Sequence, residues 1–153
     1  MIFVHIGAGV GDLDPSTNFR DGFSEYVKKN KSEEKIIFVV EANPKNIEKL
    51  KDCWKDYKNV KIFNFAITPN DYLRDNITLY YSQDDKPYYQ LLSRDRNHVE
   101  NYFPNSEIKE IEIKTIKIKN FLENNFLDLK IYSFSMDVEC LDYKIFMDID
   151  LKK

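Results

Sequence analysis

The first eleven residues place an apolar run directly before a glycine-rich turn. Ile2–Ile6 is typical of a buried strand, and Gly7, Gly9 and Gly11 follow it at alternate positions. A turn of this kind lets the backbone approach a ligand closely, and the next helix offers free N–H groups at its positive end. The pattern predicts the first strand, loop and helix of an open parallel sheet.

A second apolar run ends in a single carboxylate. Ile36–Val40 has five consecutive apolar residues, four of them β-branched, which indicates a strand buried on both faces. Glu41 follows at once and can accept both hydroxyls of a ribose in a bidentate pair. We expect the glycines and Glu41 to hold a nucleoside cofactor. The alternative is that the glycines only form a tight turn between strand and helix.

The spacing of the glycines separates two classes of cofactor. Dinucleotide-binding loops carry G-x-G-x-x-G, and the third glycine of that pattern would fall on Asp12. A carboxylate at that position would repel a pyrophosphate. The loop therefore favours a cofactor without phosphates, and S-adenosylmethionine fits because it combines adenine, ribose and a zwitterionic tail.

Apolar stretches with strand-like and helix-like spacing alternate along the rest of the chain. Phe19 to Lys31 has helical spacing, and Asn43-Pro44 is a strong helix start with Asn as cap. The later expected elements are a strand over 60–67, a strand over 77–81, a short helix around 98–103, a strand over 110–115, a short helix over 120–126, a strand over 131–136 and a helical segment over 141–151. Such alternation implies parallel pairing and right-handed crossovers. We predict one α/β domain over residues 1–153, with helices on both faces of an open, mostly parallel sheet.

Composition and charge exclude several classes of partner. Apolar residues make up 42% of the chain and charged residues 32%, as in an ordinary globular domain. Lys and Arg are scattered and the net charge is −3, so no basic patch favours nucleic acid. The sequence has no run of 18 apolar residues, so it predicts no membrane span, and it has no signal-peptide pattern. Two isolated thiols, Cys53 and Cys140, indicate a reducing compartment, and we expect a cytoplasmic location.

Two carboxylates follow the strand over 131–136. Asp137 and Glu139 would lie at the carboxyl end of that strand, the edge where open α/β sheets bind ligands. Carboxylates at i and i+2 can act as a general base, accept a substrate hydroxyl or supply part of a metal site. The alternative is that they cap the helix that begins near Cys140.

Other side chains have open assignments. His5 lies in the first strand just before the glycine turn, where a functional and a structural role are equally supported. His98 lies on an expected amphipathic helix and is better explained as solvated or partly packed. Four tyrosines could shape a substrate pocket, although strand packing explains the first pair better: Tyr80, Tyr81, Tyr88 and Tyr89.

Five segments of the chain, taken in order, resemble FkbM-type methyltransferases. They are VHIGAGVGD, VVEANPKNIEKL, VKIFNFAI, IEIKTIKIKNFLE and SMDVECLDYKIFMDIDL, and they extend over nearly the whole chain. Members of that family are S-adenosylmethionine-dependent enzymes with the class I Rossmann-like fold. They typically methylate oxygen, often on a sugar or a secondary metabolite. The resemblance implies O-methylation of a hydroxyl on a small molecule or glycan.

The resemblance also implies roles for individual residues. The loop formed by Gly7, Ala8, Gly9 and Gly11, with His5 before it, would wrap the methionine part of the cofactor. Ribose would bind to Glu41 beside Ala42, and adenine would lie near Phe65 and Ala66. Asp137 would be the base or substrate anchor beside the reacting methyl group, with Glu139 supporting it. A divalent metal is possible at this pair of carboxylates but is not required.

Two positions and the length depart from the family pattern. His5 stands where the family usually has an Asp that orients the loop, and Cys140 stands where it usually has Gly. A Cβ would crowd that turn if the turn needs a positive φ. The sheet of the family has seven strands and this chain would supply four of them plus an inserted pair, so we expect a C-terminally truncated domain.

Two alternatives to an active methyltransferase stay open. The first is a non-catalytic remnant that keeps half of the cofactor site. The second is an NAD-dependent oxidoreductase or epimerase. The glycine spacing argues against the second, and so does Asn30, which stands four residues after Tyr26 where a Tyr-x-x-x-Lys pair would need lysine.

Overall fold

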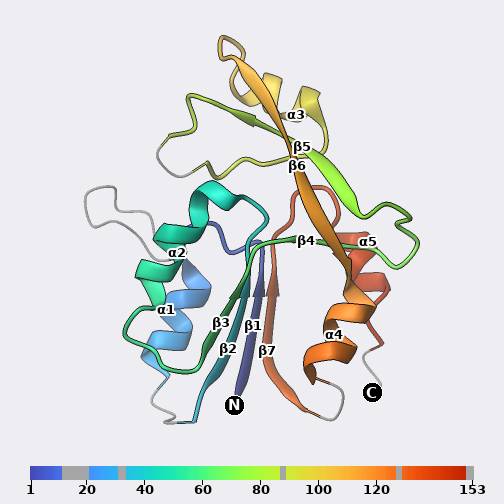
Figure 1. Cartoon of the computed structure of the whole chain (residues 1–153). Helices are drawn as coiled ribbons and strands as arrows, with labels where there is room; N and C mark the ends of the chain where they lie inside the picture. Colours follow the sequence, from blue (N-terminus) through green and yellow to red (C-terminus); the bar gives the residue numbers. More distant parts are fainter. Residues whose placement is uncertain (12–20, 31–33, 87–88, 127–128, 151–153) are drawn as a thin grey trace.

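A parallel four-stranded sheet lies at the centre of the computed structural model, which describes residues 1–11, 21–30, 34–86, 89–126 and 129–150. Its strand order is β3-β2-β1-β7 (Figure 1). The strands are β1 (Ile2–Ile6), β2 (Ile36–Val40), β3 (Val60–Phe63) and β7 (Ile131–Met136). This sheet confirms the predicted α/β class with mostly parallel, Rossmann-like pairing.

Helices cover both faces of this sheet, as predicted. On one face, α1 (Gly22–Lys29) and α2 (Ile47–Trp54) pack against side chains such as Phe3 and Val39. On the other face, α4 (Ile118–Phe126) and α5 (Asp142–Met147) pack against strand side chains such as Val4 and Val40. Every residue of β1 is therefore buried. None of the helices in the described ranges has the length and apolar character that a membrane crossing requires.

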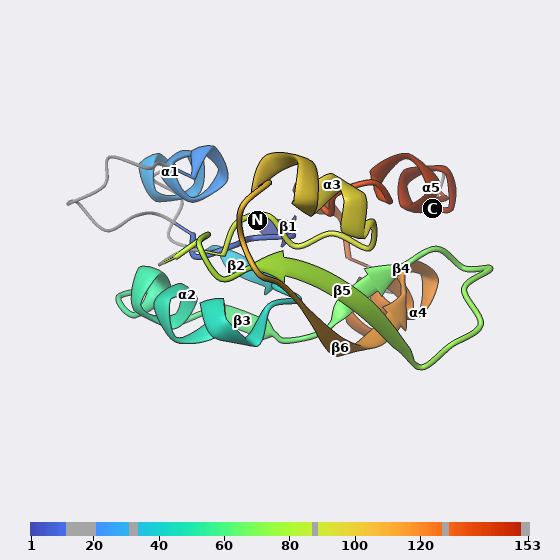
Figure 2. The same cartoon turned by 90° about the horizontal axis from the view of Figure 1, so that it is seen from above.

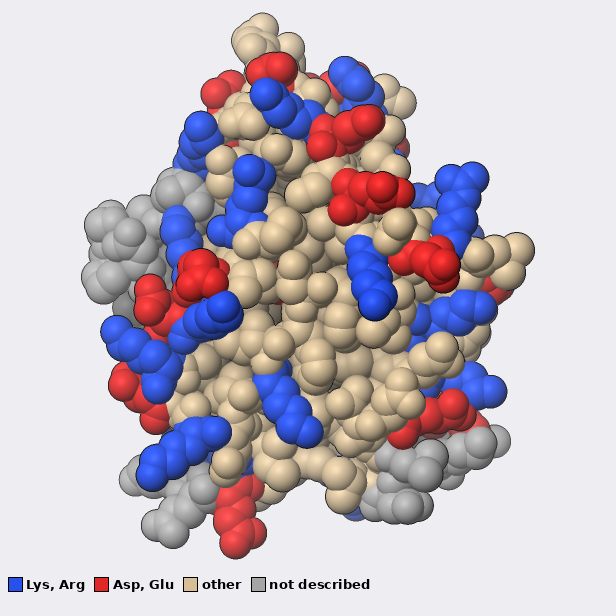
Figure 3. All heavy atoms as spheres, viewed as in Figure 1, with Lys and Arg blue, Asp and Glu red and all other residues tan. Residues whose placement is uncertain are grey.

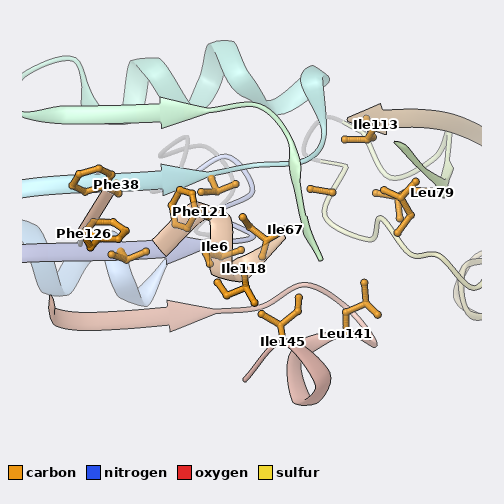
Figure 4. Close-up of a cluster of buried hydrophobic side chains, with 14 of the residues drawn as sticks. Ile6, Phe38, Ile67, Leu79, Ile113, Ile118, Phe121, Phe126, Leu141 and Ile145 are labelled. Carbon is orange, nitrogen blue, oxygen red and sulfur yellow. The ribbon is translucent and has the colours of Figure 1, made fainter. Parts of the chain in front are cut away.

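A second sheet crosses above the first one. It consists of β4 (Ala66–Thr68), β6 (Ile108–Lys117) and β5 (Asn76–Ser82), in that order, and α3 (Arg96–Tyr102) packs on it (Figure 2). β6 runs parallel to β4 and antiparallel to β5. Leu79 and Ile113 of this sheet belong to the same hydrophobic cluster as Ile6, Phe121 and Ile145 (Figure 4). The shared cluster fixes the second sheet over the carboxyl ends of the first.

The single strand expected over residues 60–67 is wrong, because the chain divides there between the two sheets. β3 pairs with β2, whereas β4 pairs with β6. Asn64 lies at the division, and its side-chain amide donates to the backbone oxygens of Glu41 at 2.9 Å and Ala42 at 3.0 Å. These bonds hold the break beside the end of β2. A continuous apolar pattern cannot reveal such a break, because both halves are strands.

The helix ends also differ from the expectation. α1 begins at Gly22, where Asp21 accepts hydrogen bonds from the backbone N–H groups of Phe23 and Ser24. Asn43 caps a short 3-10 turn, Pro44–Asn46, and α2 follows it. Five of the positions on which the predictions rest lie outside the described ranges: Asp12, Phe19, Lys31, Tyr88 and Leu151.

Charged side chains of both signs are interspersed over the surface. Figure 3 shows Lys and Arg beside Asp and Glu across one face, around a central area without charged side chains. Ion pairs between near neighbours on this surface include Lys51–Glu48 and Arg96–Glu100, both at 2.7 Å. This distribution agrees with the scattered charges of the sequence.

Candidate functional site

A cavity of about 310 Å³ lies where the carboxyl ends of β1, β2 and β7 meet. β2 lies on one side of β1 and β7 on the other, so the loops after β1 and β7 flank the switch point of the sheet, where ligands bind in open α/β folds. The volume is in the range of small-ligand sites. Ten of the residues predicted from the sequence line it: His5, Gly7, Ala8, Gly9, Glu41, Ala42, Phe65, Ala66, Asp137 and Glu139.

The three glycines of the loop have different surroundings, although all three have positive φ, at +78°, +56° and +73°. A Cβ on Gly7 would lie 1.7 Å from the backbone oxygen of Asp137. A Cβ on Gly9 would meet nothing within 4 Å, so this position leaves open space in the cavity wall. A Cβ on Gly11 would lie 2.6 Å from the sulfur of Cys53 on α2. Gly11 thus allows close helix packing and is not among the residues that line the cavity.

The Glu41 carboxylate is buried between two loops. Its Oε2 accepts the backbone N–H of Gly9 at 2.6 Å, and its Oε1 accepts that of Asn43 at 2.7 Å. Burial raises the pKa of Glu41 to about 7, although hydrogen bonds from Asn43, Gly9 and the Asn46 side chain act in the opposite direction. A carboxylate offers about four lone-pair sites, so these three hydrogen bonds do not occupy all of them. Glu41 can therefore hold the glycine loop and still accept hydrogen bonds from a ligand.

The turn after β7 brings Asp137 beside the glycine loop. The backbone N–H of Asp137 donates to the oxygen of Ile6 at 2.9 Å, which joins the end of β7 to the end of β1. The Asp142 carboxylate accepts the N–H of Val138 at 2.9 Å and holds the turn from the other side. Burial raises the pKa of Glu139, and the negative charge of Asp137 adds to that effect. Asp137 itself is exposed in the cavity wall.

Two residues of this turn adopt the left-handed backbone region that favours glycine. The φ of Glu139 is +46° and that of Cys140 is +71°. The N-cap residue of α5 is Leu141, and it is Asp142 that accepts a backbone hydrogen bond at this turn. The alternative that Asp137 and Glu139 serve as helix caps therefore finds no support in the described part of the chain.

Cys140→Gly should stabilise the protein. A residue with a Cβ costs about 1–2 kcal/mol in the left-handed region, and the greater freedom of glycine in the unfolded chain offsets about half of the gain. We expect the free energy of unfolding in urea to rise by about 0.5–1 kcal/mol. Cys140→Ala is the control, since it also removes the sulfur that lies 3.9 Å from Nδ1 of His98 but keeps the Cβ. Equal stability of the two variants would contradict the argument.

His5 forms the floor of the cavity next to a carboxylate that no motif contains. Its Nδ1 lies 3.7 Å from Oδ2 of Asp21, and its ring packs against that of Phe23 with centroids 4.5 Å apart and planes tilted by 35°. Burial lowers the pKa of His5, and the charges of Asp21 and Asp137 oppose that shift. No sequence pattern indicated that Asp21 belongs to the site. An Asp directly before a helix indicates a helix cap, but the sequence pattern predicted a helix that begins earlier, at Phe19.

The segment after β5 closes one side of the cavity and brings in residues that have no motif. Tyr89 lines the cavity in a positive-φ conformation, with its ring 5.7 Å from that of Tyr81. Lys45 lies over both rings, at 5.4 and 5.3 Å. Of the four tyrosines named above, Tyr89 lines the cavity, Tyr80 and Tyr81 belong to β5, and Tyr88 lies outside the described residues. Further lining residues that the sequence did not indicate are Asn46, Ile77, Leu79, Gln90 and Leu92.

The carboxylates of the site do not form a recognisable metal centre. Within the described ranges, no group of three or more His, Cys, Asp or Glu side chains is placed to hold a metal ion. The His98–Cys140 contact lies on the exposed side of the turn after β7.

Comparison with known families identifies the chain. No curated protein and no solved structure gives a significant match. The sequence model of the family described as Methyltransferase FkbM domain matches residues 5–153, which include the glycine loop, Glu41 and the Asp137–Glu139 turn. Because this match covers nearly all of the chain, the protein belongs to the FkbM methyltransferase family.

Proposed function

We propose that this methyltransferase uses S-adenosylmethionine and methylates a hydroxyl oxygen on a small molecule or sugar. The observation that carries the proposal is the buried Glu41 carboxylate, which joins the glycine loop to the end of β2 in the wall of the cavity. A nucleoside with two free hydroxyls and no phosphate suits this acceptor. The open space at Gly9, which a Cβ would fill, leaves room for such a ligand.

In this proposal the two ends of the cavity bind different parts of the cofactor. Glu41 accepts hydrogen bonds from the ribose, and the apolar surface of Ala42, Phe65 and Ala66 lies beside the adenine. His5 and the glycine loop contact the methionine part. His5 is buried with a lowered pKa and so remains neutral at pH 7. The anionic groups near the cofactor's amino end are then Asp21 and Asp137.

Bound S-adenosylmethionine supplies a methyl group attached to a positively charged sulfur. Asp137 accepts the proton of the acceptor hydroxyl, since it is an exposed carboxylate in the cavity wall. Glu139 has a raised pKa and holds a proton more readily than an ordinary carboxyl group, so it is suited to hydrogen-bond the acceptor. The remaining contribution is positioning of the hydroxyl.

Thermal unfolding with two ligands tests the proposal. S-adenosylhomocysteine at 100 times its Kd should stabilise the protein by about 2.7 kcal/mol and raise Tm by several degrees, whereas NAD should give no shift. Asp137→Asn should lower methyl transfer to a panel of hydroxylated sugars by about 10²–10⁴-fold and reduce the shift with S-adenosylhomocysteine much less. A shift with NAD and none with S-adenosylhomocysteine would favour an oxidoreductase. If neither ligand binds, the non-catalytic alternative is favoured.

A further inference from the structure

A second cavity, also of about 310 Å³, carries positive charge beside the first. Three cations line it, Arg74, Arg94 and Lys144, together with a single carboxylate, Asp71. The chain as a whole has a net charge of −3, so this local excess of positive charge departs from the average of the surface. Leu141 lies in the walls of both cavities. The second cavity therefore begins one side chain away from the Asp137–Glu139 turn.

The three cations come from different elements, and each backbone is fixed. Arg74 lies in the connection from β4 to β5, where its backbone oxygen accepts the hydroxyl of Thr115 at 2.8 Å. Arg94 follows Ser93, which forms two backbone hydrogen bonds with Tyr80, at 2.7 and 3.0 Å. The convergence of these residues is therefore a property of the fold and does not follow from neighbouring positions in the sequence.

Lys144 and the opposite wall of the cavity are also fixed. Lys144 lies on α5 next to the fully buried Ile145. The backbone N–H of Asn70 donates to the carboxylate of Asp148 at 2.6 Å, which joins the β4–β5 connection to the end of α5. The two walls that carry Arg74 and Lys144 are thus held together.

Three of the acidic residues close to the cations along the chain accept backbone hydrogen bonds with their side chains, and Asp75, which follows Arg74, is a further exposed carboxylate. Asp95 accepts the N–H of Asn97 as the cap of α3, Asp142 accepts that of Val138, and Asp148 accepts that of Asn70. In the part of the chain that the structure describes, the side chains of Arg74, Arg94 and Lys144 form no ion pair. Three exposed cations that share a cavity without a salt bridge favour an external anion.

We propose that this cavity binds an oxyanion, a phosphate or carboxylate carried by the methyl acceptor. The proposal rests on the function proposed above, because the main cavity must then hold the methyl donor. Arg74 and Arg94 can each donate two parallel hydrogen bonds to such a group, and Lys144 adds a point charge. The hydroxyl to be methylated would extend past Leu141 toward Asp137. The acceptor class is thus an anionic, hydroxylated small molecule.

Binding of simple anions to the full chain tests the site. The ¹⁵N-labelled protein is titrated at constant ionic strength with inorganic phosphate, glucose 6-phosphate, glucuronate and glucose. We expect resonances of the β4–β5 connection and α5 to respond to the anions and not to glucose. Arg94→Gln and Lys144→Gln should each weaken anion binding about five- to tenfold. Lys58→Gln, which removes an exposed cation before β3, should leave it unchanged.

The outcomes separate this proposal from the assignment of the cofactor. S-adenosylhomocysteine should bind all of these variants as tightly as the unchanged chain, because none of the three cations lines the main cavity. Anion binding that is the same in Arg94→Gln and Lys144→Gln as in the original chain would overturn the site. Equal methylation of neutral and anionic acceptors would overturn its assignment to the acceptor. Failure of S-adenosylhomocysteine to bind while phosphate still binds would refute the cofactor and leave the anion site standing.

Discussion

Gly7→Ala is expected to lower the free energy of unfolding by about 3–5 kcal/mol, because the new methyl group has no space. Its Cβ would lie 1.7 Å from the backbone oxygen and 2.7 Å from the backbone carbon of Asp137. Backbone atoms cannot rotate away as a side chain can, and Asp137 is hydrogen-bonded to Ile6. The ends of β1 and β7 would have to separate. The positive φ of +78° adds a further cost for any residue with a Cβ.

Gly9→Ala is the matched control for this prediction. It lies in the same loop with a φ of +56°, but its Cβ would meet nothing within 4 Å. Only the backbone cost of about 1–2 kcal/mol remains. Urea unfolding followed by circular dichroism measures both variants. Equal stability of Gly7→Ala and Gly9→Ala would show that the contact between the glycine loop and the β7 turn is not close. Gly9→Ala should nevertheless weaken the binding of S-adenosylhomocysteine, since the methyl group of the alanine would lie in the cavity wall.

Glu41→Ala is expected to weaken the binding of S-adenosylhomocysteine about a hundredfold or more. The substitution removes an acceptor from the backbone N–H groups of Gly9 and Asn43 and from the ribose hydroxyls. Hydrogen bonds to a charged group contribute about 1.5–3 kcal/mol each, so the loss of the ribose contacts alone reaches this size. Isothermal titration calorimetry measures the Kd. An unchanged Kd would refute the assignment of the ribose to Glu41.

A second ligand separates a direct contact from an effect through the loop. The 2′-deoxy analogue of S-adenosylhomocysteine lacks one of the two hydroxyls. The original chain should bind this analogue about tenfold less tightly than the parent ligand, whereas Glu41→Ala should not discriminate between them. If Glu41 acts only by shaping the loop, both proteins will show the same ratio.

The pH dependence of binding follows from the raised pKa of the same residue. Burial moves the pKa of Glu41 from an ordinary value of 4.5 to about 7. In the free protein, Glu41 makes its full contribution of roughly 3 kcal/mol to the free energy of unfolding below pH 4.5. This contribution is lost as the pH rises through 7. Ribose hydroxyls favour the ionised carboxylate, so ligand affinity should rise over the same interval. Glu41→Gln retains His5 and should lose the part of this rise that is due to Glu41.

Much of the fold follows from local patterns. Ile36–Val40 is a strand in the structure as in the sequence, because a β-branched run of that length is stable only when both of its faces are covered. Ile131–Met136 likewise has the predicted bounds. The glycine loop and the acid after β2 were recognisable because each lies directly after its strand. Parallel strands then bring these separate segments to one edge of the sheet.

The break between β3 and β4 could not be predicted, since it depends on which strands they pair with. The same is true of Asp21 and Tyr89, which reach the cavity wall through the packing of α1 and of the segment after β5. These positions carry no spacing signal of their own. Only the folded chain shows that they lie beside Glu41 and Asp137.

The sequence by itself determined the strand-loop-strand framework, the family and the positions of Glu41, Asp137 and Glu139 just after strands, because these depend on residues close together in the chain. The tertiary structure decided the separate tasks of the glycines, the left-handed backbone at Cys140 and the meeting of Arg74, Arg94 and Lys144. The physical reason is the distance along the chain. Contacts between residues 20 to 130 positions apart, such as that of Gly7 with Asp137, depend on how whole elements pack, and no local pattern of residue types encodes them.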